Sequence, residues 1–354
     1  MEKYLIRLQV IKLIQIIVVC YSPLHAFRNG LNKSGKVSYK ITSNKVNSVY
    51  YDSTIDHWYY SEDKNRYSNN DYIDVPCGCC IGCRLDYSKQ WALRCSLESL
   101  YHERTMFITL TYDDDHVPRS CFTDSLSGEI KEILTLKPDD WTRFMKRLRR
   151  YYKRDFGKEL RFYACGEYGS TTLRPHYHAI VFGLDLDDLK QISTSGTGFP
   201  IYESEFLSKC WKNGFITAQE SNFDTCAYVA RYVVKKRKGK DAQEYEQFNI
   251  EPEFVRMSRM PGIGLKYYEE HKHEIYANDE IILKDGKKFK PPSYYDDLYE
   301  KEFPEEFQKI LDKRIECAKI SDNVKEQLFG DKYKRLNREE LAKLASVKKL
   351  VREL

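Results

Sequence analysis

The spacing of apolar and polar residues along this chain separates strand-like segments from helical ones. The β-rich run 107–112, which ends at three aspartates, predicts a central strand. Residues 161–167 and 176–182 predict two more strands, and the turn-like composition between them predicts that they pair as a hairpin. Residues 254–259 predict a last strand, whereas 183–200 have the composition of a loop and 113–137 that of a long loop or hairpin.

Helical periodicity predicts the remaining elements. Apolar residues recur at helical spacing over 91–102, from Pro138 onward, over 203–211 and over 224–236. Residues 296–354 are charged and helical in pattern. Asn337 with Glu340 has the spacing of a capping box, which predicts that a final helix begins there.

These patterns divide the chain into four segments. Residues 19–104 form a Cys-rich N-terminal region, 105–260 the core, and 261–354 a C-terminal extension that is largely helical and charged. Residues 1–18 contain an apolar run preceded by basic residues, as in a signal peptide, but no small-x-small cleavage motif follows. The run is far shorter than the roughly 20 residues of a membrane helix. We therefore expect an appended segment of unknown role and no stable membrane association.

Composition narrows the class of protein. A chain of 354 residues with 42% apolar content can bury a good core, which argues against wholesale disorder. The formal charge of +5 is mild, but the basic residues are bunched, which favours a polyanionic partner. The 28 tyrosines suit base stacking and equally suit an ordinary core.

The cysteines are concentrated rather than spread. Of 11 cysteines, four lie between 77 and 83, so we expect a reduced compartment with one metal cluster rather than a disulfide framework. Cys77, Cys80 and Cys83 have the tight spacing of a zinc knuckle, and Cys79, Cys20 or a histidine could supply the fourth ligand. A cysteine-rich turn without metal is the alternative interpretation.

A second candidate metal site lies in the predicted hairpin. Side chains alternate along a strand, so His176 and His178 share one face. If Glu167 pairs with His176, then Cys165 pairs with His178, and the carboxylate joins the two imidazoles. Such a cluster, with open coordination positions, suits a divalent metal. Because a His-x-His pair can occur by chance, two half-buried strand histidines are the alternative.

Basic residues and tyrosines mark two predicted helices. A basic row follows one face of the helix that begins at Pro138, and it favours phosphate contact over a merely solvated face. A run of basic residues follows the segment 224–236. The members of the row and of the run are Arg143, Arg147, Arg150, Arg154, Lys236, Arg237 and Lys238. Tyr228, Tyr232 and Lys235 stand at i, i+4 and i+7, so they share a helix face, although packing tyrosines would have the same spacing.

The order of these motifs resembles that of one enzyme superfamily. A Phe-x-Thr-Leu-Thr-Tyr strand, a His-x-His strand and a Tyr-x-x-x-Tyr-x-x-Lys helix occur in the order of the rolling-circle replication initiators, the HUH endonucleases. Further segments resemble more narrowly the initiators of small single-stranded DNA phages of the microvirus family, in its gokushovirus branch. These segments are 20–24, 76–84, 166–169, 261–264 and 291–296. Residues 1–18 and the tail after 300 lie outside the resemblance.

The resemblance implies a fold and an activity. The fold would be α+β, an RRM-like antiparallel sheet with helices packed on one face, preceded by the Cys-rich region and followed by the helical tail. The activity would be nicking and rejoining of single-stranded DNA at a phage origin through a 5′-phosphotyrosyl intermediate. The partners would be the origin DNA with host helicase and polymerase, in the cytoplasm of the bacterial host.

The resemblance also implies residue roles. Glu167, His176 and His178 match the family's metal ligands. Family members use Mg²⁺ or Mn²⁺ there, although imidazole ligands alone would suit Zn²⁺ equally well. Tyr228 and Tyr232 match the paired nucleophiles, and Lys235 would steady the phosphate or the leaving oxygen. Two other functions fit the same residues: a non-catalytic zinc-containing DNA-binding protein, and a metal-dependent phosphodiesterase of small substrates.

Overall fold

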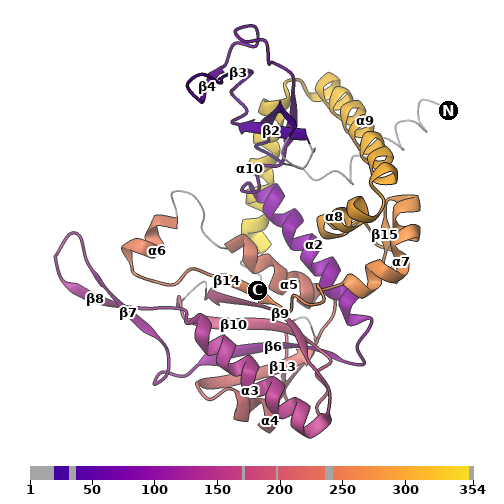
Figure 1. Ribbon diagram of the computed structural model, residues 1–354. Helices are drawn as coiled ribbons and strands as arrows, with labels where there is room; N and C mark the ends of the chain where they lie inside the picture. Colours follow the sequence, from indigo (N-terminus) through magenta and orange to yellow (C-terminus); the bar gives the residue numbers. More distant parts are fainter. Residues whose placement is uncertain (1–19, 32–36, 170–171, 197, 236–241, 351–354) are drawn as a thin grey trace. The chain divides into compact units, whose positions relative to one another are not determined.

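The protein has mixed α+β structure with antiparallel sheets (Figure 1). The computed structural model describes residues 20–31, 37–169, 172–196, 198–235 and 242–350. The appended segment at 1–18 and the basic residues Lys236, Arg237 and Lys238 lie outside the described residues. The chain forms two compact units: the residues up to Asp86 with those from Arg314 onward, and Tyr87–Lys313.

The first unit holds two small sheets and the C-terminal helix. A three-stranded sheet has the order β2-β1-β5, and β3 and β4 form a hairpin. Helix α2 begins in this unit and α9 ends in it. Its elements are β1 (Leu24–Leu31), β2 (Val37–Thr42), β3 (Ser48–Asp52), β4 (His57–Ser61), β5 (Tyr72–Val75), the start of α2 (Ile81–Ser99), the end of α9 (Pro304–Phe329) and α10 (Lys332–Leu350).

The second unit is organised around a seven-stranded antiparallel sheet of order β11-β12-β13-β6-β10-β9-β14. Its strands are β6 (Thr105–Tyr112), β9 (Arg161–Tyr168), β10 (Pro175–Phe182), β11 (Lys190–Thr194), β12 (Pro200–Glu203), β13 (Gly214–Glu220) and β14 (Phe254–Met257). Two separate hairpins are β7 (Arg119–Thr123) with β8 (Ile130–Leu134), and β15 (Ile281–Ile282) with β16 (Lys288–Phe289). Its other helices are α3 (Pro138–Phe156), α4 (Glu205–Cys210), α5 (Phe223–Lys235), α6 (Gln243–Gln247), α7 (Leu265–Asn278) and α8 (Ser293–Glu302).

Helices cover both faces of the large sheet, so the expectation of helices on one face is wrong. In Figure 1, α3 and α4 lie along one side of the sheet and α5 along the other. The physical reason lies in β10, where almost every residue is buried. A strand that is apolar on both faces needs a cover on each of them. Tyr177 and its alternates face α3, and the histidines with Ile180 and Phe182 face α5.

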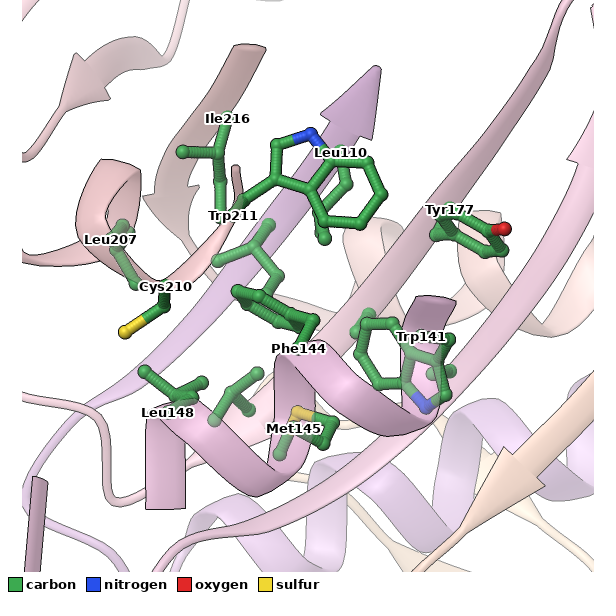
Figure 2. Packing of buried hydrophobic residues seen from close by; sticks show 14 of the residues in the cluster. Leu110, Trp141, Phe144, Met145, Leu148, Tyr177, Leu207, Cys210, Trp211 and Ile216 are labelled. Atoms are coloured by element: carbon green, nitrogen blue, oxygen red, sulfur yellow. The ribbon is translucent and has the colours of Figure 1, made fainter. Parts of the chain in front are cut away.

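The core beneath α3 follows from that helix's apolar stripe. Pro138 occupies the first turn and Gly157, with φ of 68°, ends the helix, as the sequence pattern requires. Figure 2 shows Trp141, Phe144 and Leu148 of α3 packed toward Trp211 and toward side chains of the sheet strands. The sheet is therefore held from this side by aromatic and aliphatic packing rather than by polar contacts.

Three sequence expectations differ from the structure. Residues 183–200, expected as a loop, contain the edge strand β11 and lead into β12. Helix α2 begins at Ile81, ten residues before the predicted start. The final helix begins at Lys332 rather than near Asn337, because the Asp331 carboxylate accepts a hydrogen bond from the Lys334 N–H (2.8 Å) and supplies the cap itself.

A helix that crosses a bilayer must be both long and predominantly apolar. Within the described part of the chain, no helix combines the two properties.

Candidate active site

The hairpin of β9 and β10 brings the predicted metal ligands together. The register pairs Glu167 with His176 and Cys165 with His178, which confirms the pairing expected from the sequence. Glu167, His176 and His178 each offer a ligand atom, and these atoms all lie within 4.8 Å of one another. Alternation along two adjacent strands is enough to produce this cluster.

The carboxylate of Glu167 is the centre of the cluster. Its Oε1 lies 2.7 Å from His176 Nε2 and 3.2 Å from His178 Nε2. Glu167 is 1% exposed and His178 5% exposed, so both groups are held away from bulk water. Burial alone would raise the pKa of Glu167, but hydrogen bonds from the two histidines lower it to about 2. The carboxylate is therefore ionised and available to a cation.

The outer ring nitrogens of the histidines have partners of their own. His176 Nδ1 donates to the Arg174 carbonyl oxygen at 3.0 Å, which directs Nε2 toward the cluster. His178 Nδ1 lies 2.9 Å from Thr109 Oγ1. Outer partners of this kind hold the orientation of metal-binding histidines in many sites. Two oriented imidazoles and one ionised carboxylate, with open positions left, fit a divalent cation.

One predicted nucleophile lies against this cluster. The ring of Tyr228 meets the ring of His178 edge to face, with centroids 5.4 Å apart. Tyr228 belongs to α5, whose start is fixed by a reciprocal cap: Asn222 Oδ1 accepts from the Thr225 N–H, and Thr225 Oγ1 accepts from the Asn222 N–H. The N-terminal cap and the packing of α5 on β9 and β10 therefore hold Tyr228 over the histidine face.

The other two predicted catalytic residues lie further along the same helix. Tyr232 and Lys235 stand one and two turns after Tyr228 on α5, which ends at Lys235. Among the side chains of α5, the structure describes those up to Ala230. The helical backbone is consistent with the shared face that the spacing predicts.

The basic row predicted to contact phosphate is not brought to the cluster. Arg143, Arg147, Arg150 and Arg154 belong to α3, on the opposite face of the sheet. Arg147 donates from Nε to the Cys210 carbonyl oxygen at 2.7 Å and so joins α3 to α4. Phosphate contact by this row stays a prediction, and any such contact would be made away from the histidines.

Two residues of the site were not singled out in the sequence. Thr109 holds His178 through its hydroxyl, and Phe107 stacks on the His178 ring at 5.5 Å with the rings 13° apart. Both side chains lie on one face of β6, because they are two residues apart, and Thr109 is paired directly with His178. The alternation of 107–111 was visible in the sequence, but the pairing of β6 with β10 was not.

The cysteines form a second cluster, in the first unit. The sulfurs of Cys20, Cys77, Cys80 and Cys83 all lie within 4.8 Å of one another. The sequence left Cys79, Cys20 or a histidine as the fourth member. In the structure Cys20 joins the other three, whereas Cys79 is exposed.

Comparisons with known proteins follow the same motifs. The family model for replication-associated proteins of the ORF2 type matches residues 105–237. The chain is 35% identical to replication-associated protein ORF2 of Spiroplasma virus 4 over 334 residues, 90% of this chain and 95% of that protein. It is 32% identical to replication-associated protein VP4 of Bdellovibrio phage phiMH2K over 261 residues, 72% and 77% of the two chains.

A third relative is replication-associated protein ORF4 of Chlamydia phage 1, which is 30% identical over 252 residues, 68% of this chain and 59% of that one. No solved structure matches this chain.

Proposed function

Because the chain belongs to the family of microvirus-type replication-associated proteins, we propose that it initiates phage DNA replication by nicking and rejoining single-stranded DNA at the origin. The link between cuts is a 5′-phosphotyrosyl ester, and the large sheet is an HUH endonuclease fold. One observation carries the proposal: the ring of Tyr228 lies against His178, one of three ligands gathered in the cluster. The partner is origin DNA, with host helicase and polymerase following in the bacterial cytoplasm.

The residues of the cluster prepare the scissile phosphate. Glu167, His176 and His178 would hold Mg²⁺ or Mn²⁺, which when bound polarises the phosphate and offsets the charge that develops on it. Thr109 and the Arg174 carbonyl keep the two imidazoles oriented, so the ligand nitrogens need little rearrangement. Phe107, stacked on His178, shields this side of the site from water.

The covalent step balances without a further reactant. The phenol oxygen of Tyr228 attacks phosphorus, a P–O bond forms to the tyrosine, and the bond to the 3′ oxygen breaks. The phenol loses its proton, and the released 3′ oxygen gains one. Attack by a 3′ hydroxyl on the phosphotyrosyl ester reverses the step and reseals the strand.

Two tyrosines and a lysine divide the remaining work. A phenol with an ordinary pKa of about 10 is a weak nucleophile at neutral pH, so catalysis acts mainly on the phosphate. Tyr232, one turn beyond Tyr228, cuts again while the first tyrosine still holds a 5′ end. Lys235, one turn further, places positive charge near the phosphate or the departing oxygen.

Adduct formation tests the nucleophiles. Purified protein is incubated with Mn²⁺ and single-stranded DNA carrying the phage origin, and the covalent complex is measured on denaturing gels. We expect Tyr228→Phe and Tyr232→Phe each to lower the yield of adduct and the double variant to form none. Tyr151→Phe, on α3 across the sheet, is the matched control and should retain full yield. Adduct in the double variant would refute the assignment.

Removal of a ligand separates the proposal from the two other functions. His176→Ala should abolish cleavage while DNA binding, measured by fluorescence anisotropy, changes little. A non-catalytic DNA-binding protein would show binding without any cleavage in the wild type. A phosphodiesterase of small substrates would hydrolyse a nucleotide diester and leave no protein on the DNA.

A further inference from the structure

The four-cysteine cluster of the first unit has the geometry of a closed metal site. We propose that Cys20, Cys77, Cys80 and Cys83 bind one Zn²⁺ as four thiolates, and that this ion stabilises the first unit. All four are free cysteines, and the Sγ atoms of Cys20 and Cys80 lie 3.9 Å apart. Zn–S bonds of about 2.3 Å arranged as a tetrahedron require sulfurs about 3.8 Å apart.

The fold of the first unit explains why Cys20 is the fourth ligand. Strands β1 and β5 pair antiparallel, with Leu24 opposite Val75. The chain before β1 therefore runs back past the chain that leaves β5. Cys20 lies four residues before Leu24 and Cys77 two after Val75, so the sheet register itself brings these two cysteines together.

Backbone groups around the sulfurs are arranged for thiolates. Cys77 Sγ accepts from the N–H groups of Cys79 (3.4 Å) and Cys80 (3.3 Å), which Gly78 permits by turning the chain at φ of 70°. Cys20 Sγ accepts from the Cys77 N–H at 3.3 Å. Cys80 Sγ accepts from the N–H groups of Tyr21 (3.3 Å) and Cys83 (3.5 Å). Such bonds favour the charged sulfur that a metal needs.

The position of the cluster at a helix start adds to this preference. Helix α2 begins at Ile81, between Cys80 and Cys83. Its first turn presents the positive end of the helix dipole to the sulfurs, which favours negative charge there. With four protein ligands the ion has no open position, so its role is structural rather than catalytic.

The first unit has little else to hold it together. Its buried apolar residues, among those that the structure describes, are Ala26, Phe27, Val49, Ile81, Cys83 and Leu336. Large apolar side chains of its strands, such as Ile41 (55%) and Ile73 (50%), are exposed. Small regions with so small a core usually rely on a metal or on disulfides for stability. A bridge from Cys20 to 77–83 closes the loop that contains all five strands.

Metal content is the primary test. The full-length protein, purified under reducing conditions with Zn²⁺ supplied and no chelator, should contain about one zinc per chain by elemental analysis. Cys80→Ser and Cys83→Ser should lose most of this zinc. Cys79→Ser is the matched control, since this exposed cysteine lies in the same turn outside the cluster, and it should keep the wild-type content.

A second measurement on the wild type covers the case in which the serine variants fail to fold. Iodoacetamide followed by mass spectrometry should modify Cys79 and Cys121, both exposed, and spare the four clustered cysteines until a chelator removes the ion. Chelation should also speed hydrogen exchange in β1 and β5 while β6 and β10 stay protected. Zinc-free protein, iron in place of zinc, or Cys79→Ser losing as much zinc as Cys80→Ser would overturn the proposal. None of these readouts depends on DNA cleavage.

Discussion

At the scale of single residues, His178 shows how one side chain is made suitable by its neighbours. Thr109 meets its Nδ1, Phe107 covers one ring face and the ring of Tyr228 lies against the other side. Glu167 takes the Nε2 side. Each contact removes a freedom that the histidine would otherwise lose only when an ion binds, so the ligand is already oriented.

Replacing Thr109 by valine should weaken metal binding without removing a ligand. Valine has the same shape but cannot hydrogen-bond to His178 Nδ1, so we expect Mn²⁺ to bind about tenfold more weakly, measured by electron paramagnetic resonance titration. Thr111→Val is the control, because it lies two residues away on the same face and its backbone carbonyl accepts from Trp211 Nε1. Equal losses in both variants would mean that the strand, rather than the hydroxyl, is responsible.

At the scale of elements, the end of α2 is joined to two distant segments by one carboxylate. Glu98 Oε2 accepts from the Gly264 N–H at 2.7 Å, at the start of α7, and Oε1 accepts from Arg161 Nε at 2.5 Å, at the start of β9. Burial raises the pKa of Glu98, but hydrogen bonds from His102, Gly264 and Arg161 outweigh it and hold the pKa below its ordinary value. The ionised form therefore stabilises the fold.

Glu98→Gln should lower the free energy of unfolding by about 2 kcal/mol at pH 7, because Arg161 then loses its partner in a largely buried place. A lowered folded-state pKa stabilises above the ordinary carboxyl pKa of about 4.3 and is lost as pH falls through the folded value. The difference between wild type and variant in urea unfolding should therefore shrink below that pH. Glu103→Gln, an exposed partner of Lys158, should change stability by less than about 0.5 kcal/mol. A pH-independent difference would contradict this account.

At the scale of the whole molecule, the first unit is assembled from both halves of the chain. His25 of β1 is fully buried, stacks on Tyr72 with centroids 3.7 Å apart, and lies 2.6 Å from the hydroxyl of Tyr333 in α10. Lys332 Nζ donates to Asp74 of β5 at 2.6 Å. The C-terminal helix therefore completes the N-terminal sheet, and neither segment is a separate appendage.

Tyr333→Phe should destabilise only this unit. Loss of the hydroxyl removes a partner from a buried imidazole, which should cost about 1 kcal/mol and speed amide exchange in β1 about fivefold. Exchange in β6 and β10 should be unchanged. Tyr39→Phe, at an exposed position of β2, serves as the control. Faster exchange across the large sheet as well would show that the two units unfold together.

The sequence by itself determined what depends on near neighbours. Alternation placed His176 and His178 on one face, and the short connection from Glu167 allowed a single sensible register. Helical spacing set Tyr228 and Tyr232 one turn apart. The order of these motifs was sufficient to identify the family, because each depends on local backbone geometry that the residues themselves specify.

Tertiary structure alone decided which distant segments meet. Thr109 faces His178 across 69 positions of sequence, and Cys20 reaches Cys80 across 60. The arginines of α3 lie on the far side of the sheet, although their helix was predicted correctly. Periodicity records which face of an element is apolar, but the partner of that face depends on strand register and packing over the whole chain, which no local pattern contains.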